Sequence, residues 1–209
     1  MPTETSLDAF VAALASSAPT PGGGAASALA GALAAALGEM VGQLTTGRAR
    51  YQAVEPEVRH ILGELAARRT ELLRLMDEDA AAYGQVAAAY ALPRGGEDER
   101  ATRDAAVRAA LGAAIAPPRQ IGIAALEVVR LAGAIAAIGN ATVASDAGCA
   151  ALLGEAAVRC ATLNVLANAV LLRGDEAAGW ALAEAEVRDA EAATLREQAL
   201  ATMRARIGA

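Results

Sequence analysis

Small apolar side chains dominate this sequence, and they restrict how its interior can be built. Sixty of the 209 residues are alanine, whereas Phe, Trp and Tyr together make up 2% of the chain. Alanine has the highest helix propensity and loses no side-chain entropy on ordering, so such a chain favours helices whose backbones approach closely. Strand signals are nearly absent, because no stretch sustains the alternation of apolar and polar residues. The expected fold class is therefore all-α.

Prolines and glycines divide the chain into about seven expected helices. The breaks fall at residues 18–24, 93–96, 117–118, 139–140 and 174, and Pro56 suits the first turn of a further helix. The expected helices cover approximately residues 5–17, 25–44, 56–90, 97–116, 117–138, 145–172 and 175–206. Long helices with short connections are typical of an up-and-down helical bundle. Residues 1–209 are expected to form a single domain, since the chain is short for two independent cores.

The ionisable residues exclude several kinds of chemistry. All 18 basic residues are arginine, so the chain offers no lysine for a Schiff base or a P-loop. One histidine, His60, and two cysteines, Cys149 and Cys160, do not supply the strong ligands of a zinc site, so no metal site is expected. The cysteines fit buried packing positions better than a disulfide. A reduced, intracellular setting is expected.

Charge and hydropathy limit the partners. A net charge of −6 and scarce aromatic residues argue against nucleic acid as a partner. Residues 11–38 carry no charge, but the prolines and glycines of 18–24 interrupt them, so no membrane span is expected. The N-terminal residues show no basic region of a signal peptide. The sequence therefore predicts a cytoplasmic protein.

The segment from Pro21 to Gly24 is the first candidate site. Glycines allow backbone N–H groups to approach a ligand, and a helix N-terminus favours an anion. The structural alternative is a turn that needs glycines with positive φ.

Three polar residues of the expected 145–172 helix form the second candidate site. Asp146, Asn164 and Asn168 share one helix face, because they are separated by 18 and 4 residues. The alternatives are helix capping for Asp146 and interhelical hydrogen bonds for the asparagines. Eighteen residues of helix separate Asp146 and Asn164 by about 27 Å, too far to act on one atom within a subunit.

Arg48, Arg50 and Tyr51 form the third candidate site, just after the expected 25–44 helix. Guanidinium groups bind carboxylates well, so this cluster could clamp a ligand that carries carboxylates. The alternative is a solvated helix end.

A set of short motifs occurs in a fixed order along most of the chain. The motifs lie at residues 18–24, 39–41, 44–51, 77–79, 92–93, 103, 117, 139–140, 145–148, 164–165 and 168. In this combination, from about residue 7 to 172, the sequence resembles the cyclodeaminase/cyclohydrolase family of tetrahydrofolate one-carbon metabolism. The resemblance implies an all-helical homodimer that binds folate in a groove near the subunit interface.

The same resemblance implies one of two reactions. One is the hydrolysis of 5,10-methenyltetrahydrofolate to 10-formyltetrahydrofolate. The other is the ring closure of 5-formiminotetrahydrofolate with loss of ammonia. No cofactor is implied beyond the tetrahydrofolate substrate, and Asp146 would be the catalytic acid/base group.

By this resemblance, the residues predicted to bind the substrate are Gly22, Gly23, Gly24, Arg48, Arg50, Tyr51, Asn140, Asn164 and Asn168. The glycines would approach the ligand through backbone N–H groups, and the cluster at 48–51 would hold the glutamate tail or the pteridine. The asparagines would hydrogen-bond the heterocycle, from different subunits if the separation of 27 Å is to be bridged.

Three positions depart from the family pattern. Family members often carry lysine where this chain has Ala49, Ile138 and Val170, and only the first of these has arginine neighbours. A cyclodeaminase follows a formiminotransferase domain in the bifunctional relatives, and this sequence contains none, so a cyclohydrolase is the first expectation. The alternatives are a formiminotetrahydrofolate cyclodeaminase and a non-catalytic folate-binding helical dimer.

Overall fold

The structure is a computed structural model that describes residues 6–208. Within this range there are seven α-helices, two short 3-10 helices and no strand, which confirms the all-α prediction. The α-helices are α1 (Leu7–Leu14), α2 (Gly23–Gln43), α3 (Glu55–Tyr90), α4 (Glu97–Ala113), α5 (Ala116–Ile138), α6 (Ala144–Leu171) and α7 (Glu176–Ile207). The 3-10 helices are η2 (Ala49–Val54) and η3 (Ala141–Val143).

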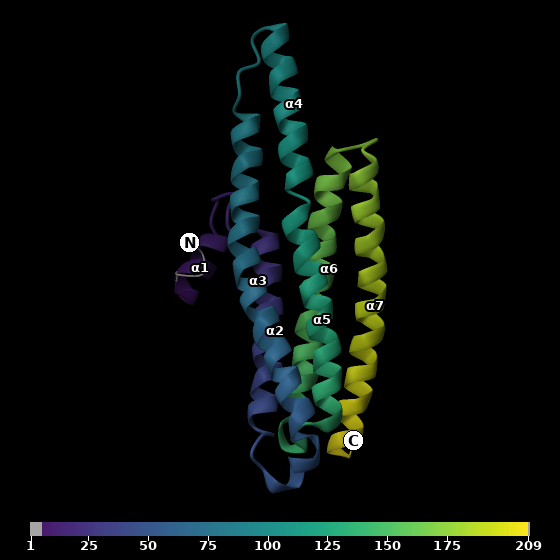
Figure 1. The fold of residues 1–209 in the computed structure, drawn as a ribbon. Coiled ribbons are helices and arrows are strands. Elements are labelled where there is room, and N and C mark those ends of the chain that lie inside the picture. The colour runs from purple at the N-terminus through teal and green to yellow at the C-terminus, as the bar shows by residue number, and fades with distance from the viewer. Residues whose placement is uncertain (1–5, 209) are drawn as a thin grey trace.

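The long helices form an up-and-down bundle (Figure 1). Helices α2, α3, α5, α6 and α7 lie side by side, and α4 continues into α5 with only Ala114 and Ile115 between them. If α4 and α5 are counted as one helix, residues 6–208 contain six α-helices. The upper parts of α3 and α4 project beyond the ends of α6 and α7 (Figure 1). We call this projecting helix pair the α3–α4 arm.

Helix α2 begins two residues earlier than predicted and α6 one residue earlier, and both starts bear on the predicted sites. The loop expected at 18–24 ends at the N-cap residue Gly22, and Gly23 opens α2. None of these glycines has a positive φ, so the turn alternative is wrong. Helix α6 begins at Ala144 after the N-cap residue Val143, so Asp146 lies in the first turn and does not cap the helix. The start of α2 lies against Asp79 of α3, a neighbour that the local sequence does not reveal.

Glycines bring the helices of the core into close contact. A Cβ atom added at Gly38 of α2 would lie 2.9 Å from a methyl group of Leu65 on α3. A Cβ atom added at Gly154 of α6 would lie 2.8 Å from a methyl group of Val129 on α5. Missing side chains therefore make room for the few larger ones, which is how a core poor in large residues is filled.

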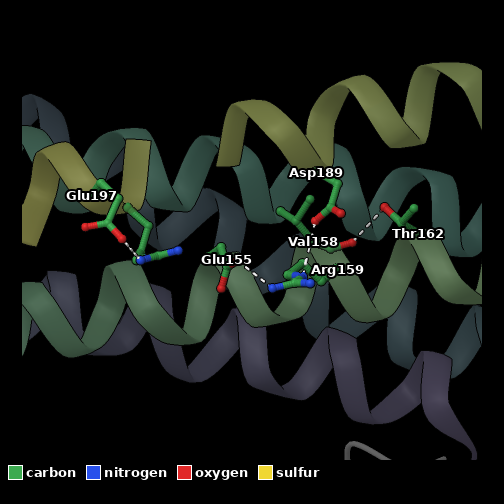
Figure 2. Close-up of polar contacts among 7 residues, drawn as sticks. Glu155, Val158, Arg159, Thr162, Asp189 and Glu197 are labelled. Atoms are coloured by element: carbon green, nitrogen blue, oxygen red, sulfur yellow. Dashed lines mark hydrogen bonds and ion pairs between the residues drawn. The ribbon is translucent and has the colours of Figure 1, made fainter. Parts of the chain in front are cut away.

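Polar groups join α6 to α7 along their shared side (Figure 2). The guanidinium of Arg159 lies 3.5 Å from the carboxylate of Glu155 and 3.6 Å from that of Asp189 on α7. The hydroxyl of Thr162 donates to the Val158 carbonyl at 3.1 Å and to the Ala185 carbonyl of α7 at 3.2 Å. These contacts fix α7 against α6.

Helices α2 and α6 both carry an exposed apolar stripe. The exposed side chains are Leu33 and Met40 on α2, Leu44 directly after its end, and Leu152, Leu163, Leu166, Val170 and Leu171 on α6. They recur at helical spacing, and α2 packs against α6. We call these residues the α2–α6 face. Cys149 and Cys160 are free and exposed, so the expectation that they are buried is wrong, because the helix places both toward the outside.

Three stretches are long and apolar enough to cross a membrane by length and composition: Gly23–Gln43, Glu97–Ile138 and Ala141–Leu171. The most apolar windows of these stretches are 50–56% buried inside the bundle. Three statements stay predictions: the protein has no membrane partner, it is cytoplasmic, and residues 1–209 form a single domain.

Candidate functional site

A cleft of about 430 Å³ lies where the α3–α4 arm leaves the bundle. Ligand sites for small molecules commonly have volumes of this size. The start of α2, the second half of α3, the end of α4 and the end of α6 line the cleft. The predicted site residues among its lining are Gly22, Gly23, Gly24, Asn164 and Asn168. The structure thus joins the first candidate site to one end of the second.

A carboxyl group from α3 lies against the start of α2 inside this cleft. Asp79 of α3 accepts a hydrogen bond from the backbone N–H of Ala25. Such a bond provides an acceptor for one of the N–H groups that have no partner within the helix. Burial raises the pKa of Asp79 above its ordinary value, and the hydrogen bond from Ala25 opposes the rise.

Gly24 makes this arrangement possible. A Cβ atom on Gly24 would lie 2.1 Å from one carboxylate oxygen of Asp79, and any side chain there would displace the carboxylate. At Gly23 the corresponding atom would lie 3.4 Å from the Asn164 amide, which is ordinary contact. The lack of a side chain therefore matters most at Gly24.

The two asparagines of α6 face the cleft with their amide nitrogens already engaged. Asn164 donates to the Cys160 carbonyl at 2.8 Å, within α6. Asn168 donates to the Ala114 carbonyl at 2.9 Å, at the break between α4 and α5. The interhelical bond foreseen as an alternative thus exists for Asn168. Neither side-chain oxygen accepts a hydrogen bond from residues 6–208, so both can accept one from a ligand.

Two tyrosines complete the wall that α3 contributes. Tyr83 and Tyr90 line the cleft, and each is 45% exposed. The guanidinium of Arg103 on α4 lies 5.3 Å from the ring centre of Tyr90 and donates to its carbonyl at 3.2 Å. Flat aromatic surfaces of this kind can stack on a ring system in a ligand.

The structure adds Asp79, Tyr83 and Tyr90 to the site residues predicted from the sequence. Spacings of four and seven residues place them on one face of α3, a periodic signal that could have identified them as a group. Asp79 also lies in the 77–79 motif.

The remaining predicted residues lie at the opposite end of the bundle. Asn140 is 3% exposed, and its amide donates to the Leu44 carbonyl at 3.1 Å. The Tyr51 hydroxyl donates to the Asn140 side-chain oxygen at 3.4 Å and accepts from the Ala141 N–H at 3.2 Å. These bonds tie the turn before α6 to the end of α2 and to η2.

Arg48, Arg50 and Asp146 belong to the same end. Arg48 and Arg50 are exposed, and the Arg50 guanidinium lies 5.7 Å from the ring centre of Tyr51. Asp146 is half-buried in the first turn of α6. It is separated from Asn164 by about 27 Å of continuous helix, as the spacing predicts. The structure therefore divides the predicted site residues into two groups, one in the cleft and one far from it.

No group of three or more His, Cys, Asp or Glu side chains among residues 6–208 is arranged to hold a metal ion. That the protein needs no cofactor beyond its substrate stays a prediction.

The sequence is similar to those of known proteins along most of its length. Residues 6–187 match the family described as Formiminotransferase-cyclodeaminase. A methenyltetrahydrofolate cyclohydrolase of Methylorubrum extorquens is 39% identical over 96% of this chain and 97% of its own length. A formimidoyltransferase-cyclodeaminase of Rattus norvegicus is 33% identical over 79% of this chain, which corresponds to only 30% of that larger protein.

A solved structure has the same fold. The formiminotetrahydrofolate cyclodeaminase of Thermotoga maritima superposes with a TM-score of 0.85 and 29% sequence identity over 96% of both chains. The family match covers most of the chain, and the cyclohydrolase relative aligns along almost its whole length. The chain belongs to the formiminotransferase-cyclodeaminase family.

Proposed function

We propose that the protein is a methenyltetrahydrofolate cyclohydrolase, which hydrolyses 5,10-methenyltetrahydrofolate to 10-formyltetrahydrofolate. The observation that carries this proposal is the near end-to-end alignment with the cyclohydrolase of Methylorubrum extorquens. The cyclodeaminase of Thermotoga maritima also matches over 96% of both chains, so formiminotetrahydrofolate cyclodeaminase is the second candidate function.

The cleft offers groups that suit such a substrate. Tyr83 and Tyr90 provide flat surfaces on one helix face for the ring systems of a folate. The side-chain oxygens of Asn164 and Asn168 can accept hydrogen bonds from the N–H groups of a pteridine. The reaction itself adds water to a carbon held between two nitrogens, so it requires a group that accepts and returns a proton.

We also propose that the protein is a homodimer joined through the α2–α6 face. Exposed apolar stripes on two neighbouring helices of one protomer can pack against the same stripes of a second copy. A two-fold axis perpendicular to these helices reverses their direction. It would bring Arg48, Arg50 and Asp146 of one protomer toward the cleft of the other, where residues from different subunits could share a ligand.

The loss of methenyltetrahydrofolate absorbance in the presence of purified protein tests the proposed function. A rate above the spontaneous background supports the cyclohydrolase. A rate equal to background, together with ammonia release from formiminotetrahydrofolate, would show the cyclodeaminase instead. Folate binding without consumption of either compound would show a non-catalytic binder.

A further inference from the structure

The cleft contains a single carboxyl group in its lining. The titratable residues that line it are Asp79, Tyr83 and Tyr90, all from α3, while the parts of α2, α4 and α6 that face it contribute none. A tyrosine hydroxyl is a much weaker proton acceptor than a carboxylate. Asp79 is thus the only lining side chain suited to exchange protons with a substrate there.

We propose that Asp79, rather than Asp146, moves the protons of the reaction, an assignment that rests on the proposed function. Asp79 lies in the cleft of its own protomer, beside the asparagine and tyrosine side chains that face a ligand. Asp146 lies about 27 Å away from Asn164 along α6 and can reach the cleft only from a second copy. Acid/base catalysis needs the group within hydrogen-bond reach of the reacting atoms.

The structure holds the Asp79 carboxylate in a fixed place. The Ala25 N–H donates to it, and the missing side chain of Gly24 leaves the space that it fills. Burial raises the pKa of Asp79, which makes its ionised form a stronger base than an exposed aspartate. The methenyl substrate is a cation whose charge is shared by N5 and N10, so its binding favours the ionised carboxylate next to it.

The proposed steps use one carboxyl group twice. In the first step, the carboxylate takes a proton from water while the water oxygen bonds to the one-carbon atom, which gives a neutral tetrahedral adduct and a protonated Asp79. In the second step, Asp79 gives this proton to N5 as the bond between carbon and N5 breaks. The hydroxyl of the adduct loses its proton to the carboxylate, directly or through water, and becomes the formyl oxygen. Release of that proton to solvent restores Asp79, so cation and water yield 10-formyltetrahydrofolate and one proton.

The test compares Asp79→Asn with Asp146→Asn. Asparagine keeps an oxygen that can accept from Ala25, so the start of α2 stays intact while proton transfer is lost. Glu78→Gln is the matched control, because Glu78 neighbours Asp79 but is exposed and pairs with Arg74. Rates of methenyltetrahydrofolate loss are measured across pH, and binding of 10-formyltetrahydrofolate is measured to show that the cleft is retained.

The expected result is a fall in kcat of about 100-fold or more for Asp79→Asn, with product binding and the Glu78→Gln rate unchanged. The wild-type rate should fall as the pH is lowered through the raised pKa of Asp79, and this dependence should vanish in the variant. A variant with wild-type kcat and pH profile, or a loss seen only in Asp146→Asn, would overturn the assignment.

If the wild type does not accelerate methenyltetrahydrofolate loss, the proposed function fails, and the variants are assayed for ammonia release from formiminotetrahydrofolate. Loss of that activity in Asp79→Asn alone would support Asp79 as the proton carrier in the second reaction. A wild type that is inactive on both compounds overturns the assignment as well.

Discussion

The carboxylate of Asp79 fills the space that a side chain on Gly24 would need, with only 2.1 Å between its oxygen and the Cβ position. The two residues come from different helices and are 55 positions apart in the chain. Their contact places an acidic group at the N-terminus of α2, where the helix dipole favours a negative charge. A glycine in the first turn of α2 and a half-buried acid on the neighbouring helix α3 therefore form one structural unit.

Gly24→Ala should push the Asp79 carboxylate away from the start of α2 and reduce activity. The added methyl group must displace the carboxylate, and a displacement of about 1 Å can cost about 100-fold in rate. Gly63→Ala on α3 is the control, because no atom lies within 4 Å of its Cβ position. It should leave the rate unchanged and raise the free energy of unfolding by up to about 1 kcal/mol. Initial rates and thermal unfolding of both variants check this, and a fully active Gly24→Ala enzyme would contradict it.

Asp79→Asn should not weaken the fold at neutral pH. The pKa of Asp79 is raised in the folded protein, so the folded state holds its proton more tightly than the unfolded state. The free energy of unfolding of the wild type therefore falls, relative to that of the variant, as the pH rises from the ordinary aspartate pKa through the raised one. Urea unfolding of both proteins at several pH values measures this difference. A variant that loses stability relative to the wild type as the pH rises would show the opposite sign.

Adding a side chain at a close contact between α5 and α6 should destabilise the protein. Gly154→Ala places a methyl group 2.8 Å from the stiff side chain of Val129, and overpacking of this kind typically costs about 1–3 kcal/mol. Gly179→Ala on α7 adds the same group where no atom lies within 4 Å, so it should be neutral or stabilising. Denaturant unfolding distinguishes the two, and equal stabilities would mean that α5 and α6 can move apart freely.

Asn140→Ala should be more harmful to stability than Asn164→Ala. Asn140 is buried and bonds to groups of α2, η2 and η3, so its loss leaves several partners unsatisfied at about 1–3 kcal/mol for a buried polar group. Asn164 donates only within its own helix. Thermal unfolding gives the order of stability. The reverse order would indicate that the turn before α6 does not need this network.

A charge on the α2–α6 face should separate the proposed dimer. Leu33→Arg and Leu163→Arg each replace an exposed leucine, 51% and 63% exposed, by a charge that an apolar interface would bury. Trp180→Arg is the control, because Trp180 is 76% exposed on α7, outside this face. Sedimentation velocity should show a dimer for the wild type and the control and a monomer for both leucine variants. A monomeric wild type would contradict the proposed dimer.

Local sequence features predict most of this fold. Prolines and glycines place the ends of α3, α5 and α7 within a few residues, because breaks in helices are local. The start of α2 differs by two residues because Asp79 of a neighbouring helix lies against it, whereas the start of α6 differs from the predicted one by a single residue. Helical spacing correctly put Asp146 and Asn164 on one helix at a long separation. It could not show that α3 supplies the acid of the cleft, since that depends on which helices become neighbours.

Cys149 and Cys160 give the α2–α6 face a chemical reporter of its own. Both thiols point outward from α6, about 16 Å apart along the helix, and the chain has no other cysteine. A thiol reagent reaches them on an isolated protomer, whereas a partner packed on this face would shield them. The rate of labelling by this reagent therefore measures the exposure of the surface through the protein's own two cysteines, with no substitution in the sequence.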